Sequence, residues 1–171
     1  MRSMNRIWIG VIASGILLFS AFFILHAFLP KTDKGVERFE KEFGLDLPGD
    51  TKTIFHTDDY GAMGDGYRLY VYQLTAKGMT AFVNDKQLGN WDSLPMKDNL
   101  IEGVHDKIDG LSHSTITHKI DLHAKKGFYL IKNRYDKPLK GYDFEDLSYN
   151  NIIVGIIDIK ANKIYFCTWD M

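Results

Sequence analysis

Residues 7–29 constrain this chain more than any other stretch. They form a run of 23 residues, IWIGVIASGILLFSAFFILHAFL, that contains no Asp, Glu, Lys or Arg. As a helix rising about 1.5 Å per residue, the run reaches roughly 34 Å, which exceeds the hydrocarbon core of a bilayer at about 30 Å. Trp8 stands at one edge of the run, and Pro30 disfavours helix at the other. The sequence therefore predicts an N-terminal transmembrane helix.

Two alternatives for the same run are a buried core helix and a cleaved signal peptide. A helix at the surface of a small domain's core carries a polar stripe, whereas this run is apolar on all sides. A signal peptide has a shorter apolar region followed by small residues at a cleavage site, and no such pattern follows residue 29. No cysteine lies at the end of the run, so lipid attachment there is not expected. We therefore expect an uncleaved anchor in the lipid bilayer.

The charges on either side of the predicted anchor do not strongly favour one orientation. Arg2 and Arg6 precede it, and four basic residues soon follow it: Lys31, Lys34, Arg38 and Lys41. Because long domains translocate largely regardless of charge, we expect a single-pass plasma-membrane protein with an extracytoplasmic domain, and the reverse topology stays open. Gly10 and Ser14 make one small-xxx-small step, a pattern that allows a homodimer through the membrane helix.

Charge and composition favour one folded domain after the anchor. The chain has 21 Lys and Arg against 22 Asp and Glu, without the basic face that nucleic-acid binding requires. A single cysteine excludes an internal disulfide, so an apolar core has to hold the domain together. Four segments are predicted: a short basic tail at residues 1–6, the anchor at 7–29, a charged helix and turn at 30–50, and a globular α+β domain at 51–171.

Runs of β-branched and aromatic residues predict the sheet of this domain. The runs most like strands are residues 51–57, 67–74, 115–122, 127–133, 151–159 and 164–169. The last two are separated by a tight polar turn, in which Asn162 can take a left-handed conformation. Short helices are expected at residues 75–84 and 97–104. The predicted fold is α+β: an N-terminal transmembrane helix, then an antiparallel sheet of about five strands with a few short helices.

The most unusual loop lies between the first two predicted strands, where residues 58–66 hold three Asp and three Gly. The candidate binding residues lie in or beside this loop: His56, Asp58, Asp59 and Asp65. Oxygen-rich loops bind calcium when carboxylates converge, but the spacing departs from the twelve-residue calcium loop, which needs acids at alternate positions and a final Glu. The plainer interpretation is a hairpin loop whose glycines take positive φ.

A histidine beside carboxylates can also act as a general base. Of this group, His56 and Asp58 face the same way if the segment is a strand. No nucleophile motif such as Gly-x-Ser-x-Gly accompanies them. We therefore assign no catalytic residue, no metal ligand and no cofactor from the sequence, and consider a non-enzymatic protein the better interpretation.

Three short motifs carry a resemblance: GLDLP at residues 44–48, DYGAMGDG at 59–66 and IYFCTWD at 164–170. Together they resemble small, mostly uncharacterised membrane-anchored or lipoprotein-like proteins of Gram-positive bacteria. The resemblance implies no activity, so no catalytic residue follows from it. The lipid-attachment cysteine of such lipoproteins is missing here.

Two functions from different classes are consistent with these features. The first is a non-enzymatic, single-pass membrane-anchored module that binds a protein or peptide, in an immunity or envelope-stress setting. The alternative is an anchored metal-dependent hydrolase centred on the loop residues His56, Asp58, Asp59 and Asp65. Geometry discriminates between them, because a hydrolase requires these four side chains to converge in one cleft.

Overall fold

The computed structural model describes residues 33–60, 65–85, 88–112, 116, 118–133 and 151–170. The chain forms two compact units, residues 1–37 and residues 38–171. In the first unit the described residues are 33–37, where the Asp33 carboxylate accepts a hydrogen bond of 2.8 Å from the backbone N–H of Gly35. This bond caps the start of a helix, because it satisfies one of the N–H groups that have no partner within the helix.

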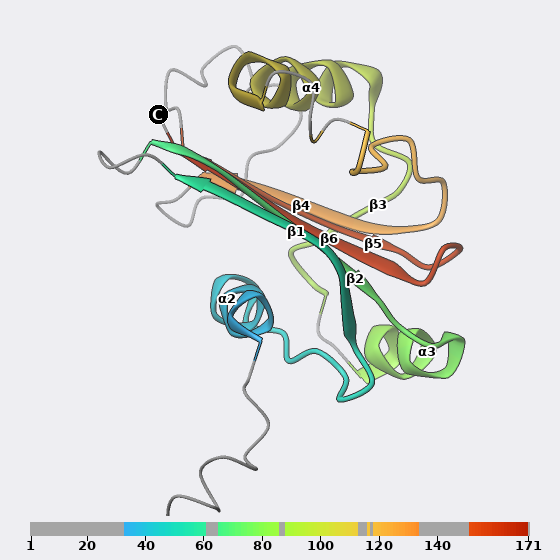
Figure 1. Cartoon of the computed structure of the whole chain (residues 1–171). Helices are drawn as coiled ribbons and strands as arrows, with labels where there is room; N and C mark the ends of the chain where they lie inside the picture. The colour runs from blue at the N-terminus through green and yellow to red at the C-terminus, as the bar shows by residue number, and fades with distance from the viewer. Residues whose placement is uncertain are drawn as a thin grey trace, which may run out of the picture. The chain divides into compact units, whose positions relative to one another are not determined.

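The second unit is built on one sheet (Figure 1). The described elements are α2 (Lys34–Phe43), β1 (Lys52–Tyr60), β2 (Gly66–Gln73), α3 (Ala76–Asp85), β3 (Asp92–Ser93), α4 (Asp98–Ser112), β4 (Gly127–Asn133), β5 (Ile152–Asp158) and β6 (Lys163–Asp170). The strand order is β1-β2-β6-β5-β4-β3, and every neighbouring pair is antiparallel. Strand β5 reads IIVGIID and is buried at every position, because it lies between β6 and β4 with side chains covering both of its faces.

The predicted fold is wrong in two respects. Among the described residues the sheet has six strands, not about five. In addition, no helix among the described residues is both long and apolar enough to cross a membrane. The longest, α4, has 15 residues, which span only about 22 Å at 1.5 Å per residue. The predicted span at residues 7–29 lies outside the described residues, as does the tail at residues 1–6.

The strand predictions failed at two places for different reasons. Strand β3 was missed because it has two residues, which is too short for any alternation to be visible in the sequence. The strand predicted at residues 115–122 is wrong, since residues 118–123 form turns and a bend. Its apolar residues Ile116, Ile120 and Leu122 are buried as expected, but they pack onto the sheet from outside it. The alternation of apolar and polar residues in this segment is therefore that of a loop packed on the sheet, and the same alternation would fit a half-buried strand.

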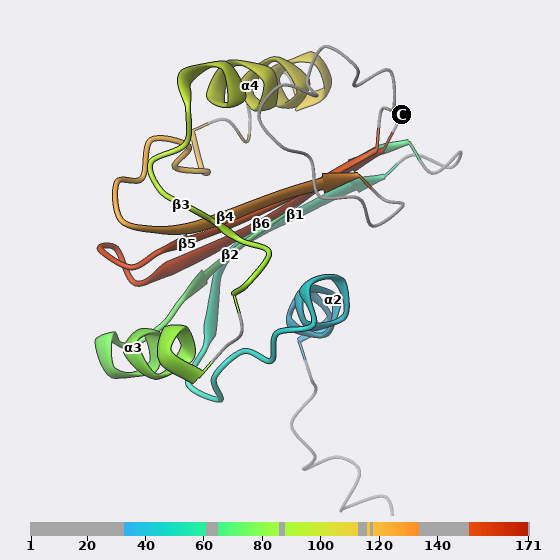
Figure 2. The same cartoon turned by 180° about the vertical axis from the view of Figure 1, so that it is seen from behind.

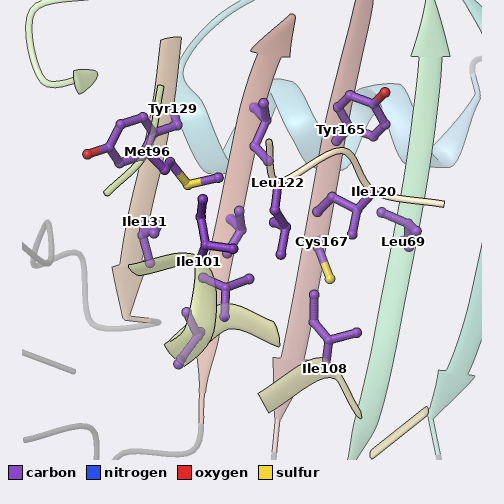
Figure 3. Packing of buried hydrophobic residues seen from close by; sticks show 14 of the residues in the cluster. Leu69, Met96, Ile101, Ile108, Ile120, Leu122, Tyr129, Ile131, Tyr165 and Cys167 are labelled. Atoms are coloured by element: carbon purple, nitrogen blue, oxygen red, sulfur yellow. The ribbon is translucent and has the colours of Figure 1, made fainter. Parts of the chain in front are cut away.

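Helix α4 and the segment after it cover one face of the sheet (Figures 1 and 2). Figure 3 shows this core from close by. The sheet contributes apolar side chains at alternate positions, among them Leu69, Tyr129, Ile131, Tyr165 and Cys167. Met96, Ile101, Ile108, Ile120 and Leu122 pack against them from the covering segments. This cluster is the larger part of the apolar core on which the domain depends in the absence of a disulfide.

Residues 38–43 of α2 and helix α3 lie on the opposite face (Figures 1 and 2). Phe39 packs edge-to-face against Tyr72 and Phe166, with ring centroids 6.0 and 5.9 Å apart. Gly155 of β5 allows a close approach here, because a Cβ atom at this residue would lie 2.6 Å from Trp91 and 2.7 Å from Phe43. The absence of a side chain at Gly155 therefore leaves room for the two rings over the centre of the sheet.

A buried lysine fixes the end of α2 to this face. Lys132 of β4 is 7% exposed, and its Nζ donates a hydrogen bond of 2.6 Å to the backbone carbonyl of Glu42. The same Nζ lies 3.5 Å from the Glu42 carboxylate. The last carbonyls of a helix lack partners within the helix and carry partial negative charge, so a cation there both satisfies and stabilises them. The helix then ends at Phe43, and Gly44 directly after it takes a φ of +65°.

The packing of the core predicts that the only cysteine is chemically inert in the folded chain. Cys167 is fully buried, and burial raises the pKa of its thiol to about 12. The thiolate is the reactive species, so we expect iodoacetamide to label native protein at least about 1,000-fold more slowly than unfolded protein at pH 8. Mass spectrometry after timed labelling, with and without denaturant, measures this ratio. Comparable rates in the two states would contradict the buried position of Cys167.

Candidate functional site

Strand β1 forms one edge of the sheet and carries most of the residues singled out in the sequence. Within the described part of the chain it pairs only with β2. Its burial alternates from Lys52 to Asp58, with the exposed positions separated by half-buried ones. The edge at the other side of the sheet, β3, has only two residues. A long edge strand presents a row of backbone N–H and C=O groups that an extended segment of another chain can bind.

Ile54 interrupts the pairing of β1 and points an apolar side chain into solvent. The register with β2 shifts between Thr53 and Phe55, so Ile54 is the extra residue of a bulge. Its side chain is 51% exposed, and it is the only large hydrophobic residue that is exposed among those described. From Phe55 to Tyr60 the pairing is regular again. The strand therefore offers six regular residues beside one exposed apolar side chain.

The four candidate binding residues do not converge. The register places His56 opposite Tyr70 and Asp58 opposite Arg68, so the two share a face, as the sequence predicted. This is the face against which Phe39 packs. Asp59 pairs with Tyr67 and lies on the other face. Asp65 precedes β2 and is exposed. Of the predicted loop, Gly66 is described and has positive φ (+150°), while residues 61–64 lie outside the described residues.

This placement gives no support to a metal centre or a catalytic pair. Among the residues that the structure describes, no group of three or more His, Cys, Asp or Glu could hold a metal ion. The imidazole of His56 stacks on the ring of Tyr70 with centroids 6.0 Å apart and planes at 11°. The carboxylate of Asp58 is bound by Arg68 instead of the histidine.

Arg68 organises the residues next to the edge strand. Its Nε and Nη2 atoms donate hydrogen bonds of 2.7 and 2.9 Å to the two carboxylate oxygens of Asp58. The guanidinium also lies over the ring of Tyr60, 4.4 Å from its centroid. The hydroxyl of Tyr60 is hydrogen-bonded to the hydroxyl of Thr168 at 3.0 Å. Paired and stacked in this way, the guanidinium is held in one orientation.

Tyr60, Arg68 and Thr168 lie on the floor of a cleft with a volume of about 430 Å³, and Asp58 is bound to Arg68 beside it. The floor includes Phe166 and Asp170 of β6, and one wall is made by Arg38, Lys41 and Glu42 of α2. A smaller pocket of about 60 Å³ adjoins the cleft, shares Arg68 and Thr168 with it, and is also lined by Ile153 of β5. The volume lies in the range of about 300–1,000 Å³ that small-molecule sites occupy.

Electrostatic interactions in the cleft follow from these pairings. The hydrogen bonds and charge of Arg68 lower the pKa of Asp58, with a smaller contribution from Arg38. Burial lowers the pKa of Arg68, but Asp58 raises it more, so the net shift is upward. Burial raises the pKa of Tyr60, and the charge of Asp170 adds to that shift. At neutral pH the Asp58–Arg68 pair is therefore ionised and Tyr60 is a neutral phenol.

The cleft contains residues that the sequence did not point to. Tyr60 and Thr168 are 108 positions apart in the chain, and Arg38 is separated from Asp58 by 20. Asp58, which is bound to Arg68 beside the cleft, belongs to the predicted set, but none of the described residues that line the cleft does. No local motif marks the others, because the order β1-β2-β6 brings them together, and that order cannot be read from any single segment.

Comparisons with known proteins add no assignment. No protein-family model, no curated protein and no solved structure matches this chain. The resemblance to Gram-positive membrane-anchored proteins stays a prediction. The function therefore has to be argued from the edge strand and the cleft themselves.

Proposed function

We propose that this protein is a non-enzymatic module that binds a protein or peptide by adding an extended segment of its partner to β1. The observation that carries the proposal is the position of Ile54, an exposed apolar side chain on a nine-residue edge strand. In strand addition, backbone hydrogen bonds supply affinity and alternate side chains supply specificity. To bury the side chain of Ile54, the partner segment has to place an apolar residue next to it.

The charged residues of β1 make this edge selective. Charges on an edge strand oppose indiscriminate pairing, and β1 carries exposed Lys52 near one end and exposed Asp58 and Asp59 near the other. A partner that pairs with β1 has to avoid a carboxylate opposite Asp59, whereas the charge of Asp58 is already offset by Arg68. Attachment to the plasma membrane and the extracytoplasmic side stay predictions from the sequence, as does an immunity or envelope-stress role.

Substitution of Ile54 tests this proposal. Random peptides are selected by phage display on the full-length chain, and the enriched peptides are titrated against purified variants. Ile54→Lys is expected to weaken their binding at least about tenfold, because burying an apolar side chain of this size contributes about 1.5–3 kcal/mol. It should change the free energy of unfolding by less than about 0.5 kcal/mol, since the side chain is exposed.

The control introduces the same charge elsewhere. Asn84 is exposed on α3, so Asn84→Lys adds a lysine away from the edge and should leave peptide affinity unchanged. Equal binding by the Ile54→Lys variant and the unaltered protein would rule out β1 as the docking strand. A selection that enriches no peptide would count against the function itself.

A further inference from the structure

The charges at the cleft are unevenly compensated. Asp58 is neutralised by its two hydrogen bonds to Arg68, and Glu42 is offset by the buried ammonium of Lys132. Arg38 reaches Asp58 only through Nη1 at 3.4 Å, which leaves most of its N–H groups available to another acceptor. Lys41 has no ion pair within the described parts of the chain.

The total charge points to a monoanion. Among the residues that the structure describes, seven charged groups lie in or directly beside the cleft: Arg38, Lys41, Arg68, Lys132, Glu42, Asp58 and Asp170. With all of them ionised, their sum is one positive charge. A phosphate would bring close to two negative charges near Glu42 and Asp170, whereas a carboxylate brings one. Guanidinium groups also match the planar geometry of a carboxylate, as Arg68 shows with Asp58.

We infer that the cleft between residues 38–42 of α2 and strands β1, β2 and β6 binds the carboxylate of a ligand through Arg38 and Lys41. Both side chains project from one wall of the cleft, three positions apart on the helix, where neighbours share a face. Phe39, between them in sequence, is buried in the core and keeps this wall in place. The inference rests on the cleft alone and stands whether or not a peptide pairs with β1.

The experiment uses the full-length chain labelled at its isoleucine methyl groups. Ile153 lines the small pocket that adjoins the cleft, and Ile108 lies under α4 on the other face and serves as the internal reference. The probes are acetate, N-acetyl-alanyl-alanine, the C-terminal amide of that dipeptide and inorganic phosphate, at constant ionic strength. We expect acetate and the free acid to shift the Ile153 signal saturably, with dissociation constants on the order of 1–10 mM. The amide and phosphate should not do so in that range.

Matched variants identify the groups responsible. Arg38→Gln combined with Lys41→Gln should weaken acetate binding at least about tenfold. Lys77→Gln combined with Lys125→Gln removes the same charge from exposed positions outside the cleft and should leave binding unchanged. An equal effect of the two pairs, a shift with the amide, tighter binding of phosphate than of acetate, or no shift of Ile153 would each overturn the inference.

The same titrations separate two sources of the carboxylate. Tighter binding of the dipeptide acid than of acetate would support a peptide C-terminus, with the rest of the chain held in the 430 Å³ volume. Equal or tighter binding of acetate would support a free carboxylic acid. Both results retain the assignment of the cleft as a carboxylate site.

Discussion

Phe39→Ala is expected to lower the free energy of unfolding by about 3–5 kcal/mol, as truncation of a fully buried phenylalanine usually does. Phe39 is 0% exposed and touches three rings: Tyr72, Phe166 and, at 4.9 Å between centroids, Phe43. Because these rings come from α2, β2 and β6, one truncation loosens the attachment of the helix to the sheet. Urea denaturation of the full-length chain measures the change.

Phe39→Leu is the matched control, since it keeps an apolar side chain and removes only the ring. Its cost should stay clearly below that of the alanine variant, because a smaller cavity is left. A loss below about 1 kcal/mol for Phe39→Ala would contradict the packing of residues 38–43 on the sheet. It would also remove the wall that the carboxylate site requires, so this result bears on function as well as on stability.

Some elements of this domain are readable from the sequence because local chemistry decides them. The run GFYLIKN forms β4 at residues 127–133, as predicted. The turn between β5 and β6 has Asn162 at φ +53°, also as predicted, and Gln73 donates hydrogen bonds to the carbonyls of Ala161 and Asn162. For the strand and for the turn, the residues on which the prediction rested lie within a few positions of one another, whereas the hydrogen bonds from Gln73 come from a distant part of the chain.

Other elements are decided by tertiary context. Residues 118–123 alternate like a strand but form turns, because the sheet is complete without them and their apolar residues can still be buried over it. The strand count was wrong for the same reason, since pairing with β4 is what gives the two residues of β3 an extended structure. The predicted transmembrane helix has no counterpart among the helices described here, all of which carry charged residues and have at most 15 residues.

The candidate site likewise has a part that local sequence predicts and a part that depends on tertiary structure. The sequence predicted that His56 and Asp58 share a face, because that depends only on the period of a strand. The sequence grouped Asp59 with these two residues, although Asp59 lies on the other face of the sheet. It also did not indicate Arg68, because the pairing of Arg68 with Asp58 depends on the register of the hairpin. It also could not show that β1 lies at an edge with Ile54 exposed. Both the exposed edge and the cleft depend on the order of the strands in the sheet, which no single segment of the sequence reveals.

Gly127→Ala is expected to lower the free energy of unfolding by at least about 3 kcal/mol, the second large effect predicted from this fold. Gly127 begins β4 with a φ of +140°, a conformation that residues with a side chain rarely adopt. A Cβ atom there would lie 1.8 Å from the backbone carbonyl oxygen of Ile157 on β5, so the strands themselves would have to separate. Thermal unfolding followed by circular dichroism measures the loss.

Gly89→Ala separates this steric effect from the general consequence of replacing a glycine. A Cβ atom at Gly89 meets nothing within 4 Å, so that variant should stay within about 0.5 kcal/mol of the unaltered chain. If the two variants were equally stable, the close contact between Gly127 and Ile157 would be wrong, and with it the register of β4 on β5. That register also sets the site, because the same strand places Lys132 where it binds the end of α2 and holds Arg38 and Lys41 over the cleft.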